Sequence, residues 1–288
     1  MAALIVVALS WSWRRVAVDP LTGTATADER DRGPGPAEEA ALERGLRLAE
    51  RCGGRVLAVS VGPPGAAGPL RAALAAGADE ALRVHRAEAA APRPRPDGGA
   101  ATAAALAAAI RDRAPALVLC GDRSPDGGTG AVPAFLAALL GARQALGAVD
   151  VEADGAELLV RRRIDGGRRE LLRLRAPAVV SVEGGLPLRR AGLAAVRAAR
   201  RRDVPVVEAV EPEPARAVRW GEVRAHRPRA RELPAPSGDA PLHRIRELTG
   251  GAVPAEPPVL STPGSSAAAA EVLLSYLDRH GYLPEEHR

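Results

Sequence analysis

Apolar runs of strand length alternate with longer, helix-like stretches through the first half of the sequence. The runs of Val, Leu and Ile are typical of buried strands, and the longer stretches place apolar residues at helical spacing. The predicted strands cover residues 3–9, 55–62, 80–84 and 116–121, and the predicted helices cover 36–51, 68–78, 98–114 and 131–141. The connections are too long for hairpins, so the pattern predicts an α/β fold: a Rossmann-like, mostly parallel sheet with helices on both faces.

The hydrophobic period changes in the second half of the chain. Residues 148–185 carry period-two runs separated by the turn signals "ADG" and "DGG", which predicts an antiparallel meander. Residues 191–204 predict a loop followed by a short basic helix, and residues 265–281 predict a helix with serine caps and a final glycine. Residues 211–241 are rich in proline and arginine, as in a linker or an extended arm.

These patterns divide the chain into three predicted parts. Residues 1–207 form an α/β domain with its antiparallel hairpin, and residues 208–264 form a proline- and arginine-rich arm or linker. Residues 265–288 form a C-terminal helix and tail. The proline-rich half of the arm buries too little by itself to hold one conformation, so we expect it to lie over a partner.

Composition narrows the possible functions. The 288 residues are 47% hydrophobic but only 2% aromatic, so the core must be aliphatic. All 40 basic residues are arginine, and with the excess of alanine, glycine and proline this points to a GC-rich genome. The net charge is only +5 because 35 acidic residues are interspersed, which argues against a nucleic-acid-binding surface.

Cysteine and histidine usage excludes other classes. Cys52 and Cys120 are too few for a disulfide scaffold or a cysteine-rich metal site, and the five histidines show no ligand spacing, so we expect no metal. The apolar first ten residues lack a basic segment and a cleavage site, and no later run reaches about 18 apolar residues, so we expect no membrane insertion. Cytoplasmic localisation is the expectation.

One junction carries candidate binding chemistry. In "LCGDRSPDGGTGAVPAFLAALLG", residues 119–141, a strand is followed by a glycine-rich loop and then at once by a helix. The loop lies where the carboxyl end of a parallel strand meets a helix N-terminus, and unhindered amides there can bind a phosphate. The alternative is that Gly127 and Gly128 only make a turn and Thr129 only caps the helix. The loop matches neither the P-loop nor the dinucleotide-binding fingerprint.

Six stretches, taken in order, resemble the beta subunit of electron transfer flavoproteins. They span roughly residues 1–207 and read "DPLTGT", "GPAEEAALERGLRL", "VSVGPPGAAGPLRAALAAGADEAL", "GDRSPDGGTGAVPAFLAALLG", "RRIDGGRRELLRLRAPAVVSVE" and "RRAGLAAVRAARRRDVPV". The resemblance implies the adenine nucleotide alpha hydrolase-like variant of the Rossmann-like fold. It also implies a non-catalytic electron-carrier subunit that pairs with a larger alpha subunit.

The resemblance implies cofactors and a nucleotide pocket. The alpha subunit carries most of the contacts to an FAD that takes electrons from dehydrogenases, and the beta subunit usually holds AMP, or a second FAD in electron-bifurcating members. Carried over by position, the pocket is lined by Ala8, Gly35, Pro36, Ala37, Glu38, Val61, Asp126, Gly127, Gly128, Thr129, Gly130, Ala131, Val132 and Pro133.

Partner contacts follow from the same resemblance. Leu193 occupies the position of a leucine that the family inserts into partner dehydrogenases; alternatively it is a core leucine that begins a helix. Trp11 and Trp13 either stack on a flavin contributed by the partner or pack on the sheet. Arg163 lies at a subunit contact where an acidic residue is usual, and this exchange would repel an unchanged partner.

Departures from the family pattern mark a divergent member. Gly35 replaces an asparagine, Ala131 stands where glutamine is common, and Pro133 stands where glycine is common. The pocket therefore holds AMP, FAD or nothing. The divergence suggests a member paired with a dedicated dehydrogenase system, such as those of mycofactocin gene clusters.

Two other functions fit the architecture. An ATP-using ligase or thiolase of the same fold would carry a Ser-Gly-Gly-x-Asp-Ser type of loop after the first strand, where this chain has "SWSWRR". A stand-alone nucleotide-binding stress protein would have little use for the meander and the arm.

Overall fold

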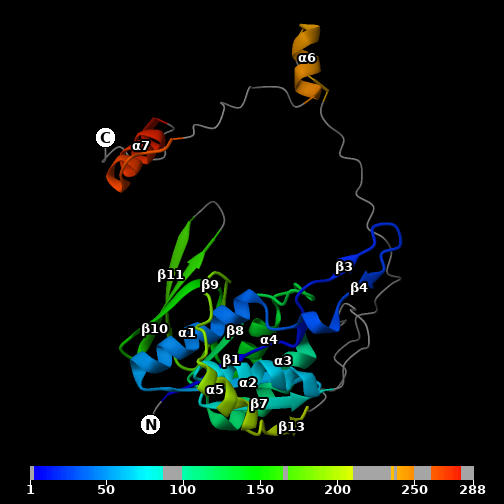
Figure 1. Cartoon of the computed structure of the whole chain (residues 1–288), viewed down its shortest axis with the longest axis vertical. Coiled ribbons are helices and arrows are strands. Elements are labelled where there is room, and N and C mark those ends of the chain that lie inside the picture. Colours follow the sequence, from blue (N-terminus) through cyan, green and yellow to red (C-terminus); the bar gives the residue numbers. More distant parts are fainter. Residues whose placement is uncertain are drawn as a thin grey trace. The chain divides into compact units, whose positions relative to one another are not determined.

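The structure, a computed structural model, describes residues 3–86, 99–164, 168–209, 235–236, 239–249 and 261–279 (Figure 1). The chain divides into two units, Met1–Arg227 and Pro228–Arg288, which are considered separately. Most of the predicted arm, residues 211–241, lies outside the described residues, as do the "DGG" turn at 165–167 and the end of the C-terminal tail. The predicted division into three parts stays a prediction.

A nine-stranded sheet forms the centre of the first unit. Its order is β11-β10-β9-β12-β8-β1-β6-β7-β13, and every pair from β9 to β13 along this order is parallel. The strands are β1 (Leu4–Ala8), β6 (Arg55–Gly62), β7 (Glu80–His85), β8 (Leu117–Gly121), β9 (Arg143–Asp154), β10 (Glu157–Arg163), β11 (Arg169–Arg175), β12 (Ala178–Val182) and β13 (Val206–Glu208). The predicted α/β fold with a mostly parallel sheet is confirmed.

Five helices cover the two faces of this sheet. The helices α1 (Pro36–Cys52), α2 (Ala67–Ala76) and α5 (Leu193–Arg201) pack on one face, and α3 (Ala100–Ile110) and α4 (Val132–Leu140) pack on the other. Alternate residues of β1 separate the two cores: Val7 faces α1, whereas Val6 faces α3 and α4. The cores are built from alanine, valine and leucine, as the low aromatic content predicts.

The predicted meander is correct for three strands and wrong for the fourth. The strands β9, β10 and β11 are antiparallel, and the turn between β9 and β10 uses Gly155 at φ +60°. The strand β12 instead runs parallel to both β8 and β9. Its sequence, "AVVSV", is buried at every position because helices cover both faces of the sheet there. Strand direction depends on how the chain crosses the sheet, which the hydrophobic period does not encode.

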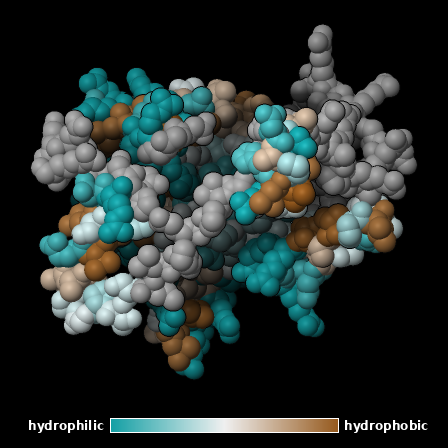
Figure 2. Space-filling view, turned by 90° about the horizontal axis from the view of Figure 1, so that it is seen from above, coloured by the Kyte–Doolittle hydropathy of each residue, from teal (hydrophilic) through white to brown (hydrophobic). Residues whose placement is uncertain are grey.

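Arginine–carboxylate pairs join the antiparallel strands at the surface. Arg161 pairs with Asp150 at 3.2 Å, and Arg173 pairs with Asp154 at 2.9 Å. Because these side chains are half exposed, each pair contributes no more than about 1 kcal/mol. Figure 2, coloured by hydropathy, shows hydrophilic residues next to hydrophobic ones on the face in view.

Short elements that the sequence pattern did not predict lie between β1 and α1 and in the second unit. The pairs β2 (Ser12–Trp13) with β5 (Arg32–Gly33) and β3 (Ala17–Val18) with β4 (Ala25–Thr26) form two small antiparallel sheets. The second unit contains α6 (Pro241–Leu248), which falls inside the predicted linker, and α7 (Ser266–Arg279), which matches the predicted C-terminal helix. None of the helices in the described ranges has the length and apolar character needed to cross a membrane.

The packing of the core predicts that truncating Leu119 strongly destabilises the protein. Its side chain is fully buried on β8 under α1, so we expect Leu119→Ala to lower the free energy of unfolding by about 2–5 kcal/mol. Leu171→Ala, at a side chain that is 57% exposed, should change it by less than about 0.5 kcal/mol. Urea unfolding of the purified protein measures both, and equal effects would contradict the assigned core.

Candidate functional site

The candidate site lies where the strand order reverses. The chain passes from β1 to β6 on one side, and β8 then pairs on the other side of β1. In open parallel sheets, ligands bind at such a switch point, beyond the carboxyl ends of the strands. Here those ends are Ala8 and Gly121, and the loops that follow them, together with the first turns of α1 and α4, hold most of the predicted pocket residues.

The N-terminus of α1 is seated directly against these strand ends. A Cβ atom at Gly121 would lie 2.7 Å from Cγ of Glu38, and one at Gly45 would lie 2.8 Å from Cγ2 of Val7. Only glycine permits so close an approach at both positions. The helix therefore brings the predicted residues Gly35 to Glu38 beside the loop that follows β8.

Glu38 ties two segments together. Its carboxylate accepts hydrogen bonds from the N–H of Ser10, at 3.1 Å, and from the N–H of Gly35, which is the N-cap residue of α1. The residue is only 6% exposed, so it links the loop after β1 to the start of the helix inside the protein. Burial raises the pKa of Glu38 to about 7, because the hydrogen bonds from Ser10 and Gly35 only partly compensate for lost hydration, and the charge of Asp126 adds to the rise.

The glycine-rich loop folds partly on itself. The N–H of Gly127 donates to Oγ of Ser124 at 3.2 Å, and the N–H of Gly128 donates to the Ser124 carbonyl at 3.0 Å. Gly128 and Gly130 both have φ near +60°, at +63° and +62°. The turn predicted as the alternative at Gly127 and Gly128 is therefore present.

The last part of the loop keeps donors for an anion. In the described chain, the N–H groups of Gly130, Ala131 and Val132 donate to no acceptor, and they lead directly into α4. Such amides at a helix N-terminus, where the helix dipole is positive, attract an anion. Pro133 is buried in the first turn of α4. The N-cap residue of α4 is Ala131, two residues after Thr129.

Pro125 occupies the space beside Gly35. A Cβ atom at Gly35 would lie 2.8 Å from Cγ of Pro125. A side chain at position 35, such as the asparagine that the resemblance expects, would therefore collide with this loop. The exchange to glycine and the position of Pro125 fit one another.

Comparison with known proteins identifies the family. A family model described as the electron transfer flavoprotein domain matches residues 24–212. The chain is 31% identical to "Protein FixA" of Rhizobium meliloti over 260 residues, which cover 84% of this chain and 86% of that protein.

The chain belongs to the electron transfer flavoprotein family. Within the family it is similar to the "Electron transfer flavoprotein subunit beta" of Thermoanaerobacterium thermosaccharolyticum, with 35% identity over 58% of this chain and 62% of that protein. It is also similar to the "Caffeyl-CoA reductase-Etf complex subunit CarD" of Acetobacterium woodii, with 32% identity over 58% of this chain and 62% of that protein. These two matches span less than two thirds of the relatives' lengths.

Two of the predicted partner-contact residues, Trp11 and Trp13, pack within the chain. The ring of Trp11 lies against Gly62 and Gly65, where an added Cβ at Gly65 would be 2.7 Å from Cζ2. Trp13 is 6% exposed, and the guanidinium of Arg32 lies 3.5 Å from its ring centroid. Nε1 of Trp13 is buried with no hydrogen-bond partner in the described chain. Stacking of either ring on a flavin stays a prediction.

The remaining predicted residues lie on different elements. Val61 is near the end of β6, beside the switch point. Leu193 begins α5 and is 69% exposed. Arg163 ends β10 and pairs with Glu183 at 2.7 Å, so its charge is already matched within the chain. The structure thus brings the nucleotide-pocket residues to one edge of the sheet, and it leaves Leu193 and Arg163 elsewhere.

Sequence reasoning missed the residues that organise the site. Ser10, Ser124 and Pro125 were not predicted, although the Ser-Pro-Asp run at 124–126 is a recognisable turn signal.

A separate hollow of about 210 Å³ lies between α1 and β9, lined by Arg44, Arg47, Arg51, Asp150, Glu152 and Leu186, among others. No group of acidic, histidine or cysteine side chains in the described ranges could hold a metal ion.

Glu38 predicts a pH dependence of stability. Its pKa in the folded chain, about 7, lies above the ordinary 4.5, so the folded chain binds the proton more tightly than the unfolded one. The protonated carboxyl of Glu38 therefore stabilises the folded chain fully below about pH 4.5, and this contribution is lost as pH rises through about 7. It amounts to at most about 3 kcal/mol of unfolding free energy.

Replacing the ionisable side chain of Glu38 tests this pH dependence of stability. We expect Glu38→Gln to remove this part of the fall in unfolding free energy with rising pH, as measured by urea unfolding at a series of pH values. Glu39→Gln changes the same charge at the next residue and should keep the fall. An identical pH profile for wild type and Glu38→Gln would contradict the assignment.

Proposed function

We propose that this protein is the beta-type subunit of an electron-carrying flavoprotein, and not an enzyme in its own right. In this proposal it pairs with an alpha subunit, shares an FAD with it, and holds an AMP-type nucleotide at the loop before α4. The pair takes electrons from dehydrogenases in the cytoplasm and passes them to a further acceptor. The names of the relatives, electron transfer flavoprotein subunits and FixA proteins, support the proposal.

The observation that carries the nucleotide proposal is the run of amides at Gly130, Ala131 and Val132 that have no acceptor among the described residues. They lie at the switch point of the sheet, and they offer donors to a phosphate without any lysine or metal. The donor set therefore fits a single phosphate group better than a triphosphate that must be neutralised. A nucleotide bound only to the folded chain stabilises it by mass action, with no bond broken.

The buried carboxyl of Glu38 sets a limit on this site. It lies beside the α1 N-terminus and feels the charge of Asp126, so the edge of the site already contains negative charge. Protonation of Glu38 below about pH 7 removes one of these charges. A phosphate should then bind more tightly at lower pH.

The FAD would be held mostly by the alpha subunit. When bound, a flavin accepts and releases electrons, a chemistry that protein side chains do not supply by themselves. In this proposal, Trp11 and Arg163 contribute to the face that meets the partner, whereas Trp13, at 6% exposed, is buried away from it. Val272, Leu273 and Tyr276 on α7 are exposed in the described chain, as expected for a segment that packs on another subunit.

Leu193 is the proposed contact to dehydrogenases. A leucine that is 69% exposed at the start of a helix can bury its side chain in a partner and stabilise the complex by about 1.5–3 kcal/mol. The alternative of a core leucine does not fit this exposure.

Co-expression with a candidate alpha subunit tests the proposal. We expect a yellow heterodimer that releases FAD and one AMP when it is denatured, identified by mass spectrometry. A colourless chain that does not associate with the alpha subunit, or one that hydrolyses ATP, would overturn the proposal.

Two glycines provide a matched test of the nucleotide loop. Both Gly128 and Gly130 have positive φ, but a Cβ at Gly130 would lie 2.8 Å from the Asp122 carbonyl, whereas Gly128 has open space. Gly128→Ala should cost only the backbone strain of about 1 kcal/mol. Gly130→Ala should also displace the loop, so we expect AMP affinity to fall at least about tenfold more, as measured by calorimetry on the nucleotide-free complex. Equal affinities in the two variants would contradict this position for the phosphate.

A further inference from the structure

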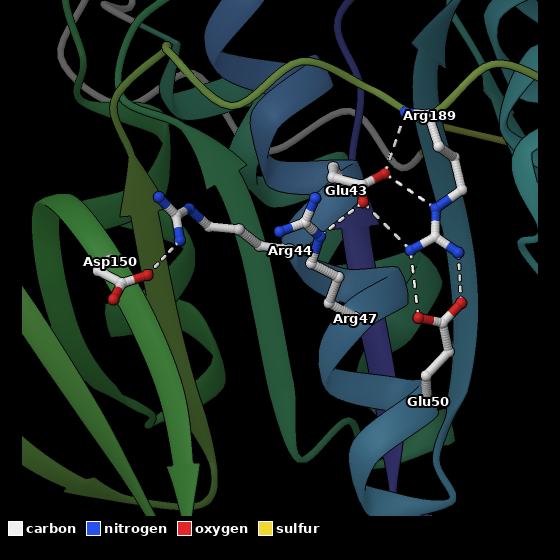
Figure 3. A network of polar contacts seen from close by, with 6 residues as sticks. All are labelled: Glu43, Arg44, Arg47, Glu50, Asp150 and Arg189. Atoms are coloured by element: carbon white, nitrogen blue, oxygen red, sulfur yellow. Dashed lines mark hydrogen bonds and ion pairs between the residues drawn. The ribbon is translucent and has the colours of Figure 1, made fainter. Parts of the chain in front are cut away.

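Arg189 joins an irregular segment to α1 through a network of charged groups. Its Nε atom donates to Oε2 of Glu43 at 2.9 Å, and its Nη2 atom donates to Oε1 of Glu43 at 3.1 Å. Nη1 and Nη2 also reach the two carboxylate oxygens of Glu50. Figure 3 shows the guanidinium of Arg189 between the two glutamates, with Arg47 approaching Glu43 from the same helix.

Glu43 is the buried centre of this network. Its side chain is only 3% exposed, and its carboxylate also accepts from the backbone N–H of Arg189 at 3.1 Å and from Nε of Arg47 at 2.7 Å. Burial alone would raise the pKa of Glu43, but the hydrogen bonds from Arg189 and Arg47 outweigh it and hold the pKa below the ordinary value. A buried carboxylate with four donors is satisfied, and losing Arg189 would leave most of its charge unmatched.

The segment that Arg189 holds has no regular structure of its own. Residues 183–192 connect β12 to α5 without a helix or a strand. The N–H of Glu183 donates to the Ala148 carbonyl at 2.9 Å, and the residues after it rely more on side-chain contacts. Leu186, Leu188 and Ala191 pack only partly against the core. Glu183 fixes the beginning of the segment through its N–H bond to the Ala148 carbonyl and its ion pair with Arg163. The network fixes the later part, through both the side chain and the backbone N–H of Arg189.

Leu193 follows directly after this segment. Gly192, the N-cap residue of α5, makes no side-chain capping bond, so the start of the helix gains no hold of that kind. A displacement of the 183–192 backbone would carry the exposed Leu193 with it. The neighbouring Arg190 does not take the place of the Arg189 guanidinium in this network. Arg190 is exposed and has no hydrogen bond or ion pair in the described chain.

We propose that Arg189 is a positioning residue for dehydrogenase docking: with Glu43 and Glu50 it clamps the 183–192 segment to α1 so that Leu193 is presented in one fixed place. This inference rests on the proposed function, since it assigns a task to Leu193. It adds the residues that pre-organise the contact. Pre-organisation lowers the ordering cost of binding, so its loss should weaken docking without changing the chemistry that follows.

The experiment compares Arg189→Met with Arg190→Met in the co-expressed heterodimer. Both variants remove one arginine charge, from adjacent residues, but only the first removes the clamp. Hydrogen exchange by mass spectrometry reports the order of residues 186–196, which we expect to exchange at least about tenfold faster in Arg189→Met and unchanged in Arg190→Met. Glu50→Gln removes only the exposed half of the clamp and should give a smaller increase, which covers the case that Arg189→Met fails to fold.

The second readout is the KM for the heterodimer as electron acceptor. The donor is a purified flavin-dependent dehydrogenase, chosen beforehand as the one that reduces the wild-type heterodimer fastest. We expect Arg189→Met to raise KM about tenfold with kcat unchanged, and to have no further effect in a Leu193→Ala background. Arg190→Met should leave KM within about twofold of wild type.

The outcomes distinguish a failure of this inference from a failure of the proposed docking function of Leu193. If exchange of 186–196 is unchanged in Arg189→Met, or if KM rises by the same factor with and without Leu193, the clamp does not position Leu193 and the inference is wrong. If Leu193→Ala leaves KM unchanged, or no dehydrogenase reduces the wild type, the docking function itself fails, whatever the exchange data show. Faster exchange together with a KM effect that depends on Leu193 supports the inference.

Discussion

The close seating of α1 on the ends of β1 and β8 is the constraint on which the rest of the structure depends. Gly45 and Gly121 leave no room for a Cβ atom between the helix and the strands. Gly121 contacts Glu38 and Ala37, and Gly45 contacts Val7 and Leu119, in a densely packed region, so the helix has little freedom to shift along the sheet. The residues that α1 carries are therefore fixed relative to the switch point, where the family resemblance places the nucleotide.

One helix thus connects the separate regions on which the proposed function rests. Glu38 at its N-terminus binds the loop after β1, and Arg44 further along pairs with Asp150 of β9. Glu43 and Glu50 hold the segment that precedes Leu193. A rigid helix gives these regions a common frame, which suits the proposed function. The coupling is mechanical: a displacement of α1 would move all of these contacts together.

The two buried glutamates of α1 show how the donors around a carboxylate decide its charge. Glu38 and Glu43 are both almost fully buried, at 6% and 2% exposed. Glu38 meets neutral donors and the repulsion of Asp126, so burial dominates and its pKa rises to about 7. Glu43 meets two guanidinium groups, so its pKa is lowered and it stays charged. The carboxyl of Glu38 can change its protonation state, which suits a site that binds an anion. The carboxylate of Glu43 stays charged, which suits a permanent attachment to Arg189.

Local sequence determined the helices other than α6 and most strands of the main sheet, because hydrophobic period, glycine C-caps and helix propensity act over a few residues. Leu193 followed from the family resemblance, and its exposure from the structure. Local sequence also placed the glycine-rich loop after a strand end, which is enough to predict an anion site. Only the tertiary structure decided that β12 runs parallel, that Pro125 fills the space beside Gly35, and that the amides left for an anion are those of Gly130 to Val132. It alone brought Arg189 to Glu43, a contact across 146 residues. Such contacts depend on where the chain crosses the sheet, and no periodicity in the sequence records that crossing.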